Sequence, residues 1–539
     1  MTLRASLRSV GVPTRRVCSC LPYRAVSTSA AALPPTIASS LANAAETDNG
    51  DSTTLNGWIR SVRRQKNVSF AVLSDASTVG GVQVVLPKGL DERLSVGCST
   101  SLRGKWVESR GKGQDKEFKV DEVSFVGESD AESYPMPNTK QGIPPPVMRK
   151  NAHLRPRKEG PASMLRVRSE MNWAMADHMR REGFVRMEMP VITSSDCEGA
   201  GEVFRVVDAT SDTASPANDV SSVNVESSLS PSSSADSTAP SPAPAPARYL
   251  TVSTQLHLEA INASLPRVYT LAPCFRAEKS DTARHLQEFW MLEAEVAFLD
   301  ADVPTALNQV MTVAEDVVRA VARHVRGLPE LEHYFAKQTP ELDARLDSLL
   351  IEQPYARMTY SRAVELLQEH VANEPDAFVF APQWGAGLQT EHERWLAEQY
   401  VKGPVFVTNY PTPLKPFYML PNPTAPESTS NAAAAPAVGT CPERGGTTAC
   451  FDLLVPSLGE LAGGSLREHR LAELERAMDA HGLGVDLAAY GWYLDLRRYG
   501  TTRHGGFGLG WERLVGLLTG IDNVRDCTAF PRAAEGSRF

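Results

Sequence analysis

Residues 267–298 constrain the fold more than any other part of the chain. They read RVYTLAPCFRAEKSDTARHLQEFWMLEAEVAF. Two apolar runs rich in β-forming residues, 268–275 and 289–298, flank a short segment that holds nearly all of the charge. This pattern predicts an antiparallel hairpin whose polar loop is held between two buried strands.

The charged residues of this hairpin suit a nucleotide. Arg276 and Glu278 alternate where the first run ends, so both side chains are expected on one face of the sheet. Arginine binds phosphate through a fork of donors, and an aromatic ring can stack on a base. The return run supplies the remaining candidates, Arg284, His285, Glu288 and Phe289. The charges alone also fit a salt-bridged surface hairpin.

The order of these residues resembles motif 2 of the class II aminoacyl-tRNA synthetases, in the subgroup for aspartate, asparagine and lysine. Within that subgroup the sequence is most similar to the enzymes that use asparagine. The resemblance implies an α+β protein, with a class II catalytic domain on a mixed, mainly antiparallel sheet preceded by an all-β OB-fold barrel. It also implies ATP as a substrate and Mg²⁺ as a cofactor.

The N-terminal segment has the composition of a targeting sequence. Residues 1–45 contain no acidic residue, are rich in Ser and Ala, and hold the arginines Arg4, Arg8, Arg15, Arg16 and Arg24. A positive segment without the apolar centre of a secretory signal is typical of a mitochondrial transit peptide. We therefore expect a leader over residues 1–45 and location in the mitochondrial matrix. A disordered tail is the alternative.

Residues 46–128 contain short alternating strands separated by Gly, Asp, Asn and Ser turns, which predicts a small barrel. With the resemblance in hand, this segment is expected to be an OB-fold anticodon-binding domain. Such barrels bind bases through aromatic rings beside basic side chains. The tRNA-binding candidates are Arg60, Arg63, Arg64 and Phe70, with Trp58 and Lys66 nearby. A solvated charged face is the alternative for any one of them.

Residues 129–160 hold many prolines and basic residues and are expected to be a hinge, which could also lie along a phosphate backbone. The catalytic domain is expected over residues 161–539. A helix over residues 164–182 that leads into a strand resembles motif 1, the dimer interface of the family, so a homodimer is expected. Residues 208–247 and 421–449 are too poor in apolar residues to fold, which predicts two mobile insertions.

The amino-acid site is expected around the segment YLTVSTQLHLE. Ser253, Gln255 and Glu259 match the xSxQLxxE pattern of the asparagine enzymes, whereas the aspartate enzymes have lysine at the position of Glu259. A carboxylate there can accept hydrogen bonds from the side-chain amide of asparagine and would repel aspartate. By the same resemblance, Arg467 is expected to bind the amino-acid side chain.

Asp452 and Glu460 lie eight residues apart on two apolar runs separated by a turn. Mg²⁺ prefers hard oxygen ligands and is usually shared with phosphate. The resemblance therefore implies that these two carboxylates are the metal ligands.

The C-terminal run RHGGFGLGWERLVGLL resembles motif 3 of the same family. Gly508 and Gly510 leave room for adenosine against the backbone, and Arg513 at the start of an apolar-faced helix is expected to hold the γ-phosphate. Motif 2 is expected to place Arg276 on the α-phosphate, Arg284 on the outer phosphates and Phe289 on adenine. Glu278 is expected to orient the substrate or the tRNA end. The catalytic candidates are Arg276, Glu278 and Arg513.

Together these features predict ATP-dependent attachment of asparagine to tRNA(Asn) through an adenylate, for mitochondrial translation. An aspartate-charging synthetase of the same subgroup and a noncatalytic nucleic-acid-binding relative are the alternatives.

The eight cysteines form no CxxC pair, which indicates neither a zinc site nor a disulfide framework. No apolar run reaches the length of a membrane span. The net charge of −9 does not indicate a nucleic-acid binder, although polyanions are bound by local patches.

Overall fold

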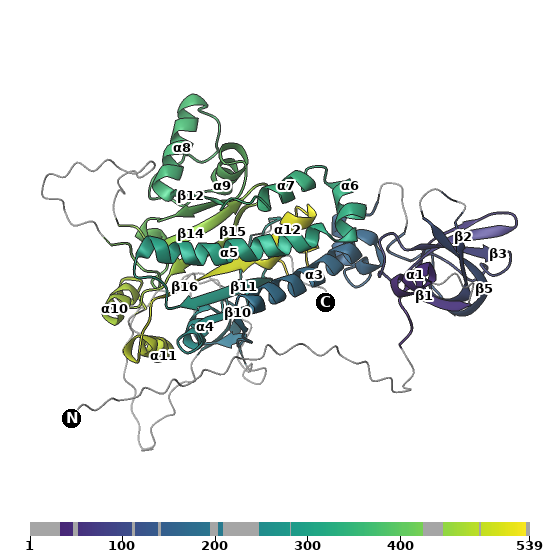
Figure 1. The fold of residues 1–539 in the computed structure, drawn as a ribbon, viewed down its shortest axis with the longest axis horizontal. Helices are drawn as coiled ribbons and strands as arrows, with labels where there is room; N and C mark the ends of the chain where they lie inside the picture. The colour runs from purple at the N-terminus through teal and green to yellow at the C-terminus, as the bar shows by residue number, and fades with distance from the viewer. Residues whose placement is uncertain are drawn as a thin grey trace, which may run out of the picture.

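The computed structural model describes residues 33–46, 52–109, 111, 114–137, 142–194, 203–207, 247–280, 282–423, 446–483 and 487–534. The predicted leader up to residue 32 lies outside the described residues, as do residues 208–246 and 424–445 of the predicted insertions. Figure 1 shows a small barrel beside a larger domain that is built on a broad sheet.

The barrel is closed and all-β, with the strand order β1-β2-β3-β5-β4. Alternate residues such as Leu55, Ile59, Val84 and Phe118 are fully buried in its core, as the period of two in a strand requires. The predicted OB-fold barrel is therefore confirmed. Its strands are β1 (Thr53–Arg64), β2 (Val68–Ser74), β3 (Val82–Pro87), β4 (Ser99–Glu108) and β5 (Lys116–Gly127).

A helix that precedes the barrel, α1 (Ile37–Glu46), packs on it. Ile37 is fully buried in the barrel core, and its backbone N–H donates to Asp75 Oδ2 at 2.8 Å. Trp106 Nε1 donates to Ser40 Oγ at 3.1 Å. The prediction of a leader up to residue 45 therefore needs a correction, because the packed domain includes Ile37–Glu46. The Ser- and Ala-rich composition that suggested targeting also suits a short helix.

The hinge joins the barrel to the larger domain through α2 (Pro145–Lys150) and the short helix η1 (Arg155–Arg157). Its arginines make contacts within the chain. Arg149 forms two hydrogen bonds with Asp526, at 3.0 and 2.6 Å, and the buried Arg155 donates to the backbone oxygens of residues 525, 528 and 529. These side chains fix the hinge to the C-terminal segment, so the structure does not leave them free to follow a phosphate backbone.

Among the described residues, the larger domain has one eight-stranded sheet in the order β12-β13-β14-β15-β16-β11-β10-β6. The two outer pairs, β12 with β13 and β10 with β6, are parallel, and the other neighbours are antiparallel. The predicted mixed, mainly antiparallel sheet is confirmed. The strands are β6 (Val185–Arg186), β10 (Arg267–Phe275), β11 (Glu288–Ala297), β12 (Ala356–Thr359), β13 (Val405–Thr408), β14 (Cys450–Val455), β15 (Gly459–Leu466) and β16 (His504–Gly510).

Helices α3 (Glu159–Arg181) and α5 (Val303–Arg326) lie side by side across the sheet (Figure 1). Buried residues of α5 recur every three or four positions, and this apolar stripe packs in the main core. A small sheet is formed by β7 (Ile192–Thr193), β8 (Arg205–Val206) and β9 (Arg248–Leu250). The other helices are α4 (Gln255–Asn262), η3 (Leu331–Phe335), α6 (Ala336–Gln338), α7 (Leu342–Leu349), α8 (Tyr360–Asn373), α9 (Thr390–Trp395), η4 (Leu396–Tyr400), η5 (Thr412–Leu414), α10 (Leu471–Ala480), α11 (Leu487–Arg498), α12 (Trp511–Thr519) and η6 (Val524–Asp526).

Strands β10 and β11 form the antiparallel hairpin that the sequence predicts, with Cys274 opposite Phe289. The second predicted insertion is shorter than expected. Thr447, Thr448 and Ala449 are buried, and Ala449 N–H donates to the Leu420 oxygen at 2.9 Å. The flanks of that segment therefore belong to the folded domain. In the described part of the chain, no helix is both long and apolar enough to span a membrane.

The packing of α1 gives a first prediction. Ile37→Ala should lower the free energy of unfolding of the barrel by about 2 kcal/mol or more, because a fully buried aliphatic side chain is lost. Chemical denaturation measures the change. Leu33→Ala is the control, since Leu33 is 90% exposed on the same segment. Equal stability of the two variants would show that α1 does not belong to the folded barrel.

Candidate active site

A cavity of about 130 Å³ lies where the β10–β11 hairpin meets β15, β16 and α12. Residues from all of these elements line it. They include the predicted nucleotide residues Arg276, Glu278, Arg284, His285, Phe289, Gly508, Gly510 and Arg513, together with Glu460. The structure thus brings together side chains that lie far apart in the sequence. Glu288 is not among the residues that line the cavity; its backbone pairs with Phe275 and bridges to Arg532.

Three arginines face this cavity from different directions. The Arg276 guanidinium carbon lies 5.3 Å from the centre of the Phe289 ring. Arg513 Nη1 donates to the backbone oxygen of Glu460 at 2.9 Å. Arg284 donates to Thr390 Oγ1, and its Nε is buried without a hydrogen-bond partner among the described residues.

The environment of Arg284 disfavours its positive charge. Burial lowers the pKa of Arg284, and the nearby charge of Arg513 lowers it further. The carboxylate of Glu393 lies 3.9 Å from the Arg284 guanidinium, at the limit of an ion pair. A cavity lined by three arginines, whose guanidinium groups are forked donors, is suited to a polyphosphate.

Glu278 and His285 face each other in the loop of the hairpin, 3.4 Å apart. Gln287 Nε2 donates to the Glu278 backbone oxygen at 3.2 Å, and the Arg276 N–H donates to the Gln287 oxygen at 3.0 Å. These contacts order the loop beside the cavity. Glu278 lines the same cavity as Arg276, Arg284 and Arg513.

Asp452 and Glu460 border one space, which allows a test of the predicted metal pair. A Cβ atom on Gly463 would lie 3.3 Å from Asp452 Oδ1 and 3.6 Å from Glu460 Oε1. Among the described residues, no group of three or more His, Cys, Asp or Glu side chains could hold a metal. Mg²⁺ is often bound by one or two carboxylates plus substrate phosphates, so the pair fits an ion shared with ATP.

Lys415 and Glu393 lie beside this pair and were not identified from the sequence. Lys415 Nζ lies 3.1 Å from Asp452 Oδ2. Burial raises the pKa of Asp452 although Lys415 opposes the shift. On α9, Glu393 accepts a hydrogen bond from the Glu460 N–H at 3.2 Å, and burial together with the Glu460 charge raises its pKa to about 7. No sequence pattern links these residues to motif 2 or motif 3.

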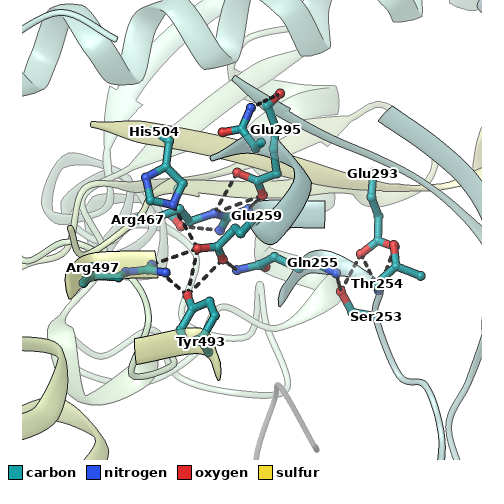
Figure 2. A network of polar contacts seen from close by, with 12 residues as sticks. Ser253, Thr254, Gln255, Glu259, Glu293, Glu295, Arg467, Tyr493, Arg497 and His504 are labelled. Atoms are coloured by element: carbon teal, nitrogen blue, oxygen red, sulfur yellow. Dashed lines mark hydrogen bonds and ion pairs between the residues drawn. The ribbon is translucent and has the colours of Figure 1, made fainter. Parts of the chain in front are cut away.

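Glu259 is at the centre of a second group of polar side chains, shown in Figure 2. Glu259 lies on α4 and is buried, and its carboxylate contacts four side chains from three elements. They are Gln255 Nε2 at 3.0 Å, Tyr493 OH at 2.8 Å, Arg497 Nη2 at 2.8 Å and His504 Nε2 at 2.9 Å. The sequence predicts a carboxylate that is free to receive an amide, whereas the structure shows one that these four groups already surround.

Arg467 and Ser253 lie in the same region (Figure 2). Arg467 forms a buried ion pair with Glu295 at 2.5 Å and donates to Ser465 Oγ at 2.7 Å. Ser253 donates to Glu293, which also accepts from the Thr254 N–H at 2.9 Å. Glu293 and Glu295 alternate on β11, and this period of two was the available sign in the sequence that both would face the site.

The four predicted tRNA-binding residues separate into two groups. Arg63 is exposed, and its guanidinium lies 5.3 Å from the Phe70 ring on the neighbouring strand. Arg60 pairs with Glu159 at the junction with α3, and Arg64 pairs with Asp91 at 2.9 Å inside the barrel domain. The structure therefore brings Arg63 and Phe70 together, so these two remain candidates for binding a base, and it gives Arg60 and Arg64 ion pairs within the chain.

Comparisons with known proteins agree with this geometry. Residues 145–534 match the family model of class II tRNA synthetases (D, K and N), and residues 53–126 match that of the OB-fold nucleic acid binding domain. The chain is 38% identical to an asparaginyl-tRNA synthetase of Mus musculus, over 90% of each chain. It is 39% identical to an asparagine–tRNA ligase of Photobacterium profundum, over 90% of this chain and 96% of the relative.

Two solved structures resemble the chain over nearly its whole length. One is asparaginyl-tRNA synthetase from Pyrococcus horikoshii complexed with asparaginyl-adenylate, with 27% identity, a TM-score of 0.70 and coverage of 90% and 95% of the two chains. The other is the Entamoeba histolytica enzyme in complex with the same adenylate, with 27% identity, a TM-score of 0.69 and coverage of 91% and 97%.

The buried pair gives the second prediction. Arg467→Met should destabilise the protein by about 3–5 kcal/mol, because it leaves Glu295 as an uncompensated buried charge. The pKa of Glu295 is already raised to about 6 by burial. A carboxyl group with a raised pKa binds its proton more tightly when folded, so the loss should be larger at pH 8 than at pH 5.

Denaturation at both pH values measures this effect. Adding Glu295→Leu to Arg467→Met should restore most of the lost stability, since the unpaired charge is then gone. Arg476→Met is the control, because Arg476 forms an exposed surface pair. Equal effects of Arg467→Met and Arg476→Met would contradict the assignment of the buried pair.

Proposed function

The chain belongs to the class II tRNA synthetases of the D, K and N group, as an asparagine–tRNA ligase, and we propose that it charges tRNA(Asn) as a homodimer in the mitochondrial matrix. One observation carries the assignment of the chemistry. Arg276, Arg284 and Arg513 converge on one cavity that also holds the aromatic ring of Phe289.

The reaction proceeds in two steps. The α-carboxylate of asparagine attacks the α-phosphorus of ATP, the bond to the bridging oxygen breaks, and pyrophosphate leaves. The asparaginyl group of the adenylate is then transferred to a hydroxyl of the terminal ribose of tRNA, and AMP leaves. Neither step needs a protein nucleophile, so positioning and charge neutralisation carry the catalysis.

The side chains of the cavity supply these effects. Arg276 would bind the α-phosphate; this role is supported by the position of its guanidinium near the ring of Phe289, on which adenine would stack. Arg284 and Arg513 also line the cavity and would bind the outer phosphates. Glu278 lies at the loop side, where it would orient the substrate or the end of the tRNA. Asp452 and Glu460 would hold Mg²⁺, which neutralises phosphate charge when it is bound.

The amino-acid site favours asparagine over aspartate. Asparagine and aspartate have nearly the same shape, so a site must separate them by charge and hydrogen-bond direction. The aspartate alternative is disfavoured, since a second carboxylate beside Glu259 and Glu295 would meet like charges in a buried site. The noncatalytic alternative is disfavoured because the arginines of the cavity and both candidate metal ligands are present.

Several exposed apolar side chains support the homodimer. Trp173 on α3 is 70% exposed, Phe298 after β11 is 77% exposed, and Val185 on the edge strand β6 is 43% exposed. Large exposed apolar groups near one sheet edge suit a second copy of the chain. Of these elements, α3 and β6 correspond to the motif 1 region that the sequence predicts as the interface.

The mitochondrial role rests on the composition of the N-terminal segment. Five arginines and no acidic residue precede Glu46. Because α1 begins at Ile37 and packs on the barrel, removal of a transit peptide should occur before that residue.

Amino-acid-dependent exchange of pyrophosphate into ATP tests the proposed activity. We expect exchange with asparagine and at least about 100-fold weaker exchange with aspartate, since a buried like-charge contact costs several kcal/mol. Each amino acid is assayed in turn under the same conditions. Equal exchange with aspartate would move the aspartate alternative to first place.

The role of Arg276 gives a further prediction. Arg276→Ala should slow adenylate formation by about 100-fold or more, the usual loss when a preorganised donor to the reacting group is removed. Single-turnover formation of the adenylate measures it, with Lys279→Ala in the exposed loop as the control. A rate within about threefold of the parent would reject the role.

The targeting proposal has its own test. Residues 1–36 fused to a fluorescent protein should direct it into mitochondria, and replacing the five arginines of that segment by glutamine should abolish import. Microscopy and protease protection of isolated mitochondria measure the outcome. A fusion that stays in the cytosol would contradict the proposal.

A further inference from the structure

Two side chains of α11 contact Glu259 and have no role in the proposed mechanism. Tyr493 and Arg497 lie four residues apart on α11, so both side chains reach the same carboxylate. The side chains of Arg497 and Glu259 are only 1% and 0% exposed. This helix lies 238 residues away from Glu259 in the sequence, and the proposed mechanism does not use it.

The acceptor capacity of Glu259 is full in this structure. A carboxylate has about four lone-pair positions, and Gln255, Tyr493, Arg497 and His504 are four hydrogen-bonding partners. Gln255 is the one of these that is only half-buried, and it is uncharged. An incoming amide can therefore take the place of Gln255, whereas Tyr493, Arg497 and His504 continue to hold the carboxylate.

Packing does not explain a charged side chain at position 497. Arg497 donates through Nε to the backbone oxygen of Glu468 at 3.0 Å, and its guanidinium carbon lies 4.2 Å from the Tyr493 ring. Its Nη1 is buried without a hydrogen-bond partner among the described residues. Apolar residues usually stabilise a buried position at least as well as an ion pair does. A buried arginine with an unused donor therefore suggests a need for its charge.

We infer that Arg497, assisted by Tyr493, is a positioning residue that determines the amino-acid specificity by holding Glu259 ionised and oriented toward the side-chain amide of asparagine. The inference rests on the proposed function. The surroundings of the carboxylate are completed by Gln255 from α4, Glu295 from β11, His504 from β16 and Arg467, the residue after β15. Burial opposes ionisation of Glu259, but Arg497 and His504 hold its pKa well below the usual value.

Removing the positive charge should change which substrate is accepted. Without Arg497, Glu259 binds a proton more readily, because less positive charge then stabilises its buried carboxylate. Each proton gained lowers the negative charge that repels aspartate. Selection of asparagine over aspartate should therefore weaken in the variant, and it should weaken further as the pH falls.

The test compares Arg497→Met, Arg497→Lys and Tyr493→Phe with the matched control Arg498→Gln. Arg498 is the next residue on α11, but its side chain is 39% exposed and pairs at the surface. Pyrophosphate exchange is measured with asparagine and with aspartate between about pH 6 and pH 8, about one unit on each side of neutrality. The KM for ATP is measured in parallel.

For Arg497→Met we expect kcat/KM for asparagine to fall by about 100-fold or more, as for loss of one partner of a buried charge pair. The KM for ATP should stay within about threefold, because α11 does not line the nucleotide cavity. The ratio of kcat/KM for asparagine to kcat/KM for aspartate should become dependent on pH in Arg497→Met. In the parent and in Arg498→Gln this ratio should not change with pH. Arg497→Lys should recover part of the selectivity.

Outcomes against the inference are distinct from a failure of the proposed function. A parent that exchanges with aspartate and not with asparagine overturns the proposed function. If the parent is specific for asparagine and all three variants keep its asparagine-to-aspartate ratio and its KM for asparagine, only the role of Arg497 is overturned. If Arg497→Met fails to fold, Tyr493→Phe decides, since it removes a single hydroxyl. A folded Tyr493→Phe with parental selectivity at every pH would then overturn the inference.

Discussion

Two carboxylates inside the larger domain, Glu259 and Glu295, determine what the surrounding elements must supply. Removing a carboxylate from water is costly unless cations and hydrogen-bond donors replace the water. The replacement comes from Arg467 directly after β15, His504 on β16 and Arg497 on α11. Gly506 leaves room beside this carboxylate, because a Cβ there would lie 2.1 Å from the Ala294 backbone oxygen and 2.3 Å from Glu295 Oε1. The packing of β16 and α11 is therefore coupled to the two charges.

The active region consists of two parts with opposite electrostatic needs. In the nucleotide cavity, burial and the charge of Arg513 disfavour the charged form of Arg284, so an arriving triphosphate would supply compensating negative charge. Around Glu259 the acceptors are already matched by donors, so an arriving side chain must be neutral to fit. Such preorganisation requires little rearrangement during the reaction, which is how a site without a protein nucleophile can accelerate phosphoryl chemistry.

The sequence predicted those features that depend on local pattern. The hairpin follows from two apolar runs around a charged loop, and the arginines and Phe289 of the cavity lie in ordered motifs. It did not predict contacts between distant segments. Composition indicated a leader where α1 packs on the barrel, and the hinge arginines Arg149 and Arg155 bind the C-terminal segment. Lys415 and Arg497 have no motif of their own, because their roles exist only once the chain is folded.

Glu460 lines the nucleotide cavity and is also one of the two candidate metal ligands. Burial opposes its ionisation, yet Arg513 and Lys415 hold its pKa below the usual value, whereas burial and the Glu460 charge raise that of Glu393. Because Arg513 donates to both the backbone and the carboxylate of Glu460, phosphate that binds Arg513 competes for the same donors. A divalent cation would replace the positive charge that Glu460 then loses. Binding of phosphate and of the metal should therefore favour each other, since each compensates a charge that the other leaves exposed.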